Sequence, residues 1–254
     1  MRIASWNVNS LRVRLQHVLD WVKENAPDVV CIQETKLVDD KFPVAELNEA
    51  GYEVVYHGQP TYNGVAILSR SAPHDVRKGM PAFEDDQARF IAATIDGIRV
   101  INLYVPNGQE VGSDKYEYKL RWLAHLRGVI EAELAAHPDL VVLGDFNIAP
   151  ADEDVHDPEA WRGKILFSEP EKAALQALLD LGLHDSFRLF PQEPGTFSWW
   201  DYRAAGFRRN LGLRIDLVLV SDALKARCRE SFIDKAPRKW ERPSDHAPAV
   251  ITLE

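Results

Sequence analysis

The sequence predicts an α/β fold of four layers, in which two mixed, mostly antiparallel sheets pack face to face and helices cover their outer surfaces. Short apolar segments typical of strands alternate with amphipathic segments typical of helices. Several strand segments follow each other closely enough to form hairpins, which indicates antiparallel pairing. Of the 254 residues, 46% are hydrophobic and 27% are charged, so the chain can fill a large core.

The first third of the chain alternates between strands and helices. Residues 2–7 alternate as a strand does, and residues 11–22 place leucine and valine at helical spacing. Asn9 or Ser10 can cap this helix, and Pro27 follows its end. Next come a strand over residues 28–33, a short helix over 44–51, and strands over 52–58 and 64–69.

A hairpin is the clearest local prediction. Asp96 and Gly97 separate two apolar runs within residues 89–106, and both can adopt the positive φ of a tight turn.

After this hairpin the order of elements repeats. We expect a helix over residues 114–136 with Asp114 and Glu117 as a capping box, a strand over 140–147, a helix opened by Ser168 and Glu171 and ending near Gly182, and strands over 214–221, 228–234 and 249–254. No stretch of Gly, Pro or Ser resembles a linker, so residues 1–254 are expected to form one domain.

Composition excludes several classes of protein. With 39 acidic and 30 basic side chains the chain carries a net charge of −9, whereas a general nucleic-acid coat protein is expected to be basic. An enzyme that contacts phosphates only in one cleft can still be acidic. There is no run of about 18 apolar residues and no start typical of a signal peptide. Because only Cys31 and Cys228 are present, we expect a cytoplasmic protein without a disulfide framework.

Polar residues recur where the predicted strands stop. Strand ends of a sandwich share a rim, so these side chains are predicted to meet in one cleft. Several also have a structural interpretation: the asparagines as cap or turn residues, Asp145 as a turn residue beside Gly144, Asp216, flanked by Arg214, as an ion pair within a strand, and Asp245 with His246 as a cap and turn before Pro248. The residues are Asn7, Asn9, Glu34, Tyr104, Asn107, Asp145, Asn147, Asp216, Asp245 and His246.

These side chains suit hydrolysis of a phosphodiester. Mg²⁺ prefers oxygen ligands, usually one or two carboxylates, and Glu34 with Asp145 or Asp245 can supply them. An aspartate can accept the proton of the attacking water, and a histidine oriented by another aspartate can donate to the phosphate. Zinc-type Cys/His spacing, a P-loop and GxGxxG are absent.

Eight motifs spread along essentially the whole chain carry a family resemblance. They are WNVNSLR (6–12), IQETK (32–36), NGVAILS (63–69), LYVPNG (103–108), GDFNIAP (144–150), TFSWWDYR (196–203), LRIDLVLVS (213–221) and SDHAP (244–248). Together they resemble bacterial exonuclease III and the related apurinic/apyrimidinic (AP) endonucleases of the endonuclease/exonuclease/phosphatase superfamily. The resemblance implies a DNase I-like fold.

The resemblance implies a metal site. Glu34 is similar to the principal ligand of Mg²⁺, with Mn²⁺ as an alternative ion, and Asn7 is similar to its hydrogen-bonded companion. Asp245 resembles either a ligand of a second ion or a support of the first. One-metal and two-metal mechanisms both remain open.

The resemblance also implies catalytic roles. Asp145 is similar to the residue that positions or deprotonates the attacking water, and Asn147 to a ligand of phosphate and water. His246 resembles an imidazole that binds a phosphate oxygen, and Asp216 the carboxylate that orients it. Tyr104 resembles a phenol aimed at the scissile phosphate or leaving group. In the family's alternative mechanism Tyr104 or His246 is the base.

Substrate-binding residues are implied mainly for residues 196–215, where aromatic side chains alternate with arginines. Such a mixture suits a DNA backbone and an unstacked sugar. A core role for Phe197 and one tryptophan is the alternative. The residues assigned to substrate by the resemblance are Asn107 beside Tyr104, Phe197, Trp199, Leu213 and Ile215 around a baseless deoxyribose, and Arg203.

The implied activity is a Mg²⁺-dependent phosphodiesterase of DNA repair. It would cleave DNA 5′ to abasic sites, leaving a 3′-hydroxyl, and remove 3′ nucleotides or blocking groups, including 3′-phosphates, from duplex DNA. The expected partner is double-stranded DNA with abasic sites or 3′ ends, with no membrane, and the expected state is a monomer. The alternatives are a superfamily phosphoesterase of the inositol phosphate or sphingomyelin type and a non-catalytic DNA-binding scaffold. A Ser-His-Asp acyl hydrolase is disfavoured because GxSxG is absent and Ser244 adjoins His246 too closely.

Overall fold

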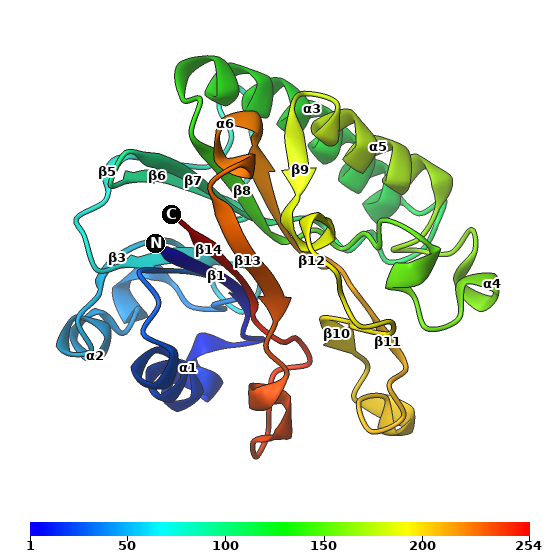
Figure 1. The fold of residues 1–254 in the computed structure, drawn as a ribbon, viewed down its shortest axis with the longest axis horizontal. Helices are drawn as coiled ribbons and strands as arrows, with labels where there is room; N and C mark the ends of the chain where they lie inside the picture. The colour runs from blue at the N-terminus through cyan, green and yellow to red at the C-terminus, as the bar shows by residue number, and fades with distance from the viewer.

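Two six-stranded sheets pack face to face in the computed structural model, which describes residues 1–254 (Figure 1). In spatial order, the first sheet contains β13 (Cys228–Ile233), β14 (Ala249–Leu253), β1 (Arg2–Asn7), β2 (Val29–Gln33), β4 (Val65–Ser69) and β3 (Glu53–His57). The second contains β5 (His74–Lys78), β6 (Phe90–Ile95), β7 (Ile98–Tyr104), β8 (Leu140–Asp145), β12 (Asp216–Ser221) and β9 (Leu183–Asp185).

Helices form the two outer layers. The outer face of the first sheet is covered by α1 (Leu11–Asn25) and α2 (Val44–Glu49), and that of the second by α3 (Asp114–Ala136) and α5 (Glu169–Leu179). The predicted four-layer fold is therefore confirmed. The remaining α-helices and strands are α4 (Pro158–Trp161), α6 (Asp222–Lys225) and a separate ribbon of β10 (Trp199–Trp200) and β11 (Gly212–Leu213), and five short 3₁₀ helices lie in the loops. No helix combines the length and apolar character needed to cross a bilayer.

Each sheet has the same strand arrangement, with one parallel pair at its centre. The pair β1 and β2 is joined by α1, and the pair β7 and β8 is joined by α3. All other neighbours within the two sheets run antiparallel. Carboxyl ends of a parallel pair lie at the same edge, so polar residues that follow these four strands are brought together.

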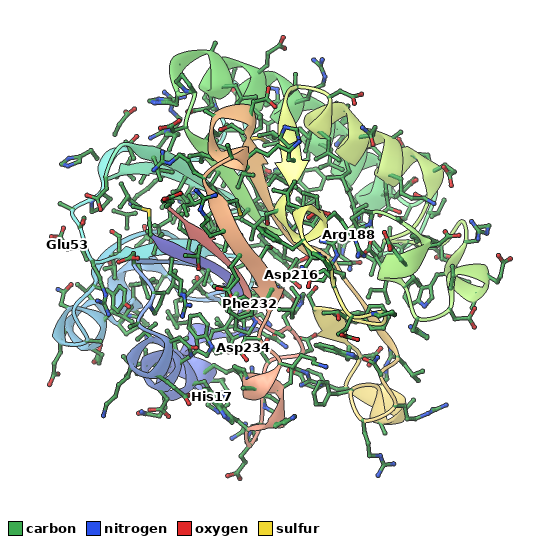
Figure 2. The ribbon with its side chains drawn as sticks, in the orientation of Figure 1. His17, Glu53, Arg188, Asp216, Phe232 and Asp234 are labelled. Carbon is green, nitrogen blue, oxygen red and sulfur yellow. The ribbon has the colours of Figure 1, made fainter.

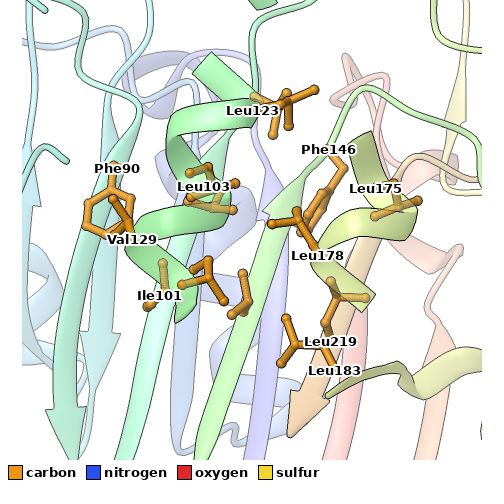
Figure 3. Packing of buried hydrophobic residues seen from close by; sticks show 14 of the residues in the cluster. Phe90, Ile101, Leu103, Leu123, Val129, Phe146, Leu175, Leu178, Leu183 and Leu219 are labelled. Carbon is orange, nitrogen blue, oxygen red and sulfur yellow. The ribbon is translucent and has the colours of Figure 1, made fainter. Parts of the chain in front are cut away.

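Alternation along the strands divides the core into layers. Ile3 and Cys31 of the first sheet face Val141 of the second in the middle layer. The opposite side chains of the first sheet, such as Trp6, pack under α1. Figure 3 shows the matching layer on the other side, where side chains of α3 and α5, including Leu178, pack on the second sheet. Burying one such leucine contributes about 1.5–3 kcal/mol.

The predictions for individual turns, helix caps and strands had different outcomes. The hairpin is confirmed, with φ of 50° at Asp96 and 82° at Gly97. The capping box of Ser168 and Glu171 is also confirmed. The capping box predicted for Asp114 and Glu117 is wrong by one residue, because the N-cap of α3 is Ser113, whose side chain accepts from Tyr116 N at 3.1 Å. Strand β5 was missed because all five of its residues are exposed and show no apolar alternation.

Candidate active site

Polar side chains from both sheets meet at the carboxyl ends of the two parallel pairs. Asn7 ends β1 and Glu34 follows β2, whereas Tyr104 ends β7 and Asp145 ends β8. Across the second sheet, Asp145 is paired in register with Tyr104 on one side and Asp216 on the other. Asp216 begins β12 and lies toward the centre of the molecule in Figure 2.

One amide group connects the two sheets at this point. The Nδ2 atom of Asn7 donates to Glu34 Oε2 at 2.6 Å and to Asp145 Oδ2 at 2.9 Å. Glu34 has a φ of 56°, in the left-handed region that non-glycine residues rarely adopt. Strained backbone of this kind is common at functional sites. The two carboxylates are therefore held together by a single donor side chain.

The imidazole of His246 lies between two aspartates. Its Nδ1 atom is 2.8 Å from Asp216 Oδ2, and its Nε2 atom is 3.6 Å from Asp145 Oδ2. An ionised carboxylate only accepts hydrogen bonds, so Nδ1 carries a proton. The Asp216 backbone amide donates to Ser198 Oγ at 3.0 Å. The alternative interpretation of Asp216, as an ion pair with Arg214, is wrong, since that guanidinium binds Asp154 and Asp185 instead.

Burial and charge shift the protonation of the central residues. Burial, strengthened by Asp216 and Glu34, raises the pKa of Asp145 to about 7, although His246 and Asn7 oppose the shift. For His246, burial alone lowers the pKa, but the surrounding aspartates outweigh it and raise the pKa to about 10. At neutral pH the imidazole is thus a cation, and Asp145 lies close to its titration point.

Tyr104 stays a neutral phenol. Burial, with Glu34 and Asp145 close by, raises its pKa well above the ordinary value of 10, and the Arg89 guanidinium only partly opposes this. Arg89 stacks over the ring at 4.9 Å from its centroid. A neutral phenol donates a hydrogen bond and cannot accept a proton as a base.

The carboxylates are suited to a divalent cation. Glu34, Asp145 and His246 each offer a ligand atom within 4.8 Å of the others. Hard ions prefer oxygen, and a protonated imidazole cannot coordinate, so Glu34 and Asp145 are the better ligands. With Asp216, three carboxylates face one imidazolium. A bound cation would compensate the excess negative charge.

Asp245 lies beside this centre without joining it. Its Oδ1 atom accepts from Asn9 Nδ2 at 3.3 Å, and its Oδ2 atom accepts from Trp199 Nε1 at 3.0 Å. Both carboxylate oxygens already have donors from the protein. Asp245 is thus placed to hold Trp199 and Asn9 near the site.

Two asparagines follow the strands of the second sheet. Asn147, with a φ of 50°, donates its backbone amide to Asp145 Oδ1 at 3.0 Å and its Nδ2 atom to Val105 O at 2.8 Å. The Oδ1 atom of Asn107 accepts from Gln109 N at 3.0 Å. Asn147 is therefore tied to both loops, whereas the Asn107 side chain supports its own turn.

The residues expected to contact substrate have mixed placements. Phe197 is buried in a cluster with Trp200, and Leu213 and Ile215 are buried in a neighbouring cluster, while Trp199 is half-buried against them. Arg203 lies in an exposed turn and pairs with Asp201 at 2.6 Å. Of this group, Trp199 is linked to the centre through Asp245.

A cavity of about 630 Å³ next to Tyr104 was not anticipated. Arg89 and Tyr118 line it from the second sheet and α3, and Tyr62 lines it from the loop before β4. Arg89 directly precedes a strand, and no motif or spacing in the sequence distinguishes it from a surface arginine.

Comparison with known proteins gives consistent matches. Residues 4–246 match the model of the Endonuclease/Exonuclease/phosphatase family. The chain is 39% identical to exodeoxyribonuclease III of Haemophilus influenzae over 261 residues, covering 98% of each chain. A 3′ phosphatase from Neisseria, solved bound to a product DNA hairpin, is 50% identical with a TM-score of 0.98, covering 100% of this chain and 99% of that one. An AP endonuclease from Archaeoglobus fulgidus is 41% identical with a TM-score of 0.96 and the same coverage.

Proposed function

We propose that this chain, which belongs to the endonuclease/exonuclease/phosphatase family and to its exonuclease III and AP endonuclease branch, is a Mg²⁺-dependent DNA repair phosphodiesterase. It cleaves duplex DNA 5′ to an abasic site, leaving a 3′-hydroxyl, and removes nucleotides or phosphate groups from 3′ ends. One observation carries the proposal: Asn7 joins Glu34 to Asp145, and His246 lies between Asp145 and Asp216. The activities for which the relatives are named support the choice of substrate.

The metal site is formed by Glu34 and Asp145, with Asn7 holding both side chains. When bound, Mg²⁺ supplies positive charge that stabilises the charge developing on the phosphate and the leaving oxygen. Asp245 supports the neighbouring loop in this scheme, because it lies outside the group of Glu34, Asp145 and His246 and accepts from Asn9 and Trp199.

The protein's own groups perform the proton transfer. Asp145, whose pKa lies near 7, accepts a proton from the attacking water while the new bond from oxygen to phosphorus forms. The His246 imidazolium, oriented by Asp216, donates a hydrogen bond from Nε2 to a non-bridging phosphate oxygen. The Tyr104 phenol donates to the phosphate or to the departing oxygen as the bond to phosphorus breaks. Asn147 keeps Asp145 in place through its backbone amide.

The competing activities fit the site less well. Ser244 cannot act as the nucleophile of an acyl hydrolase, because its hydroxyl donates to the backbone oxygen of Asn7 at 2.6 Å. A scaffold without catalysis would not require a buried aspartate with a raised pKa, Asp145, beside an imidazole. A phosphoesterase for inositol phosphates or sphingomyelin would share the carboxylates and differ in the surrounding loops.

A substrate panel tests the proposal. Duplexes carrying an abasic site, a recessed 3′ end or a 3′-phosphate, together with an inositol polyphosphate, would each be incubated with enzyme in Mg²⁺ or in EDTA. We expect cleavage of the DNA substrates only with Mg²⁺, and no phosphate release from the inositol compound. Asp145→Asn should reduce turnover by at least about 10³-fold while binding of abasic duplex persists. Hydrolysis of the inositol compound alone, or DNA cleavage in EDTA, would overturn it.

A further inference from the structure

A fully buried lysine lies beneath the candidate active site. Lys119 of α3 has 0% exposure, and its Nζ atom donates to Asn147 O at 2.7 Å, to Asn107 O at 3.2 Å and to the Glu171 carboxylate. An ammonium group has three hydrogens, so its donors are all used. Two of the three acceptors are main-chain oxygens of loops that follow the central strands of the second sheet.

Both loops lead directly from residues of the candidate site. The first follows Tyr104 at the end of β7, and the second follows Asp145 at the end of β8. Asn147 also donates its backbone amide to Asp145 Oδ1, so a shift of this loop moves the donor to that carboxylate. At Gly108, with a φ of 89°, an added Cβ would lie 3.0 Å from Lys119 Cδ, which shows how closely the first loop packs on the lysine stem.

The ammonium is itself held in one position by Glu171. The Oε1 atom of Glu171 accepts from Leu166 N at 3.0 Å, and its Oε2 atom accepts from Ser168 N at 3.0 Å and from Ser168 Oγ at 2.6 Å. Ser168 Oγ is in turn 2.7 Å from the hydroxyl of Tyr116. A buried ion pair contributes little net stability over an apolar pair of similar size, so stability alone gives weak reason for it.

We propose that Lys119 is a positioning residue for hydrolysis, whose ammonium, anchored by Glu171, joins the loops of Asn107 and Asn147 and thereby sets the orientation of Asp145. The expected effect of Lys119 on turnover rests on the proposed function, but its expected effect on the loops does not depend on any activity. The Lys119 ammonium donates only to main-chain oxygens and to Glu171, and it acts through the residues that it holds.

Three variants separate positioning from stability. Lys119→Met removes the donor to both loops and leaves Glu171 as a buried unpaired charge. Glu171→Gln keeps the lysine, its two main-chain acceptors and an amide oxygen that can accept from the ammonium, so it removes the charge of the anchor but not the anchor itself, and it is the matched control. The double variant Lys119→Met/Glu171→Gln removes both charges, so it should recover part of the stability lost in Lys119→Met.

The turnover of abasic duplex and the melting temperature should then change differently across the three variants. We expect Lys119→Met to lower kcat by about 10- to 100-fold with KM within about threefold, and to lower Tm by roughly 10 °C. Glu171→Gln should also lower Tm but keep kcat within about threefold of the original chain, and the double variant should melt above Lys119→Met without regaining kcat. If kcat follows Tm across the three variants, or if Lys119→Met keeps full kcat, the assignment is wrong.

Amide hydrogen exchange gives a second readout that does not depend on catalysis. Amides in residues 107–109 and 146–148 should exchange faster in Lys119→Met and in the double variant than in Glu171→Gln. A chain without activity on DNA would contradict the proposed function, yet this comparison would still test Lys119. Equal exchange in all three variants would overturn its role in holding the loops.

Discussion

Replacing Asp216 with asparagine removes the carboxylate that holds His246 while preserving the size of the side chain. The two groups are 2.8 Å apart, and both are buried. A hydrogen bond between charged groups contributes about 1.5–3 kcal/mol. If this amount is lost in the transition state, the rate falls by about 10- to 150-fold. Asp185→Asn is the matched control, because it removes a carboxylate that pairs with Arg214 at 2.6 Å outside the site.

The same variant should change the pH profile of the rate. In the original chain the rate should fall as His246 loses its proton near pH 10. Asp216 is the largest of the influences that raise the pKa of His246, so Asp216→Asn should move the alkaline limb toward neutral pH. Single-turnover cleavage of an abasic duplex measures both effects. A variant with an unchanged rate, or with the alkaline limb of the original chain, would refute the role of this pair.

Three further substitutions have defined outcomes. Tyr104→Phe should lower kcat by about 10- to 100-fold without altering the pH dependence of the rate, because the phenol acts as a donor. Loss of a rise in rate with increasing pH would instead identify a phenolate base. Asn7→Ala removes the donor shared by two carboxylates and should weaken the apparent Mg²⁺ affinity by about 10- to 100-fold in a metal titration of the rate. Gly144→Ala would place a Cβ 1.9 Å from Leu103 O. It should reduce the free energy of unfolding, measured by urea denaturation, by more than about 2 kcal/mol. An unchanged free energy of unfolding would show that β7 and β8 can move apart at this point.

Much of the fold could be predicted because its strands carry strong local patterns. The hairpin of β6 and β7 has apolar runs on both sides of Asp96 and Gly97, and the structure has the same turn. Strand β5 and the two-residue strands β10 and β11 lack such patterns. They exist because a neighbouring strand supplies hydrogen-bond partners, which is a tertiary effect that the local sequence does not encode.

The gathering of polar residues could be predicted from strand ends, and the family resemblance implied that Asp216 orients His246. Nothing in the sequence indicates that Arg214 binds Asp154 and Asp185. Lys119 was overlooked for a related reason, since a lysine within an amphipathic helix is normally exposed. Its burial depends on carbonyl groups and a carboxylate that distant segments bring to it.

Direct measurement of metal binding tests the account most closely. Mn²⁺ can be titrated into the DNA-free chain and followed by electron paramagnetic resonance, with Glu34→Gln as the variant and Glu24→Gln, on α1, as the control. We expect the original chain and the control to bind the ion with equal affinity, and Glu34→Gln to bind at least about 10-fold more weakly. Equal binding by all three proteins would show that the cation does not lie between Glu34 and Asp145.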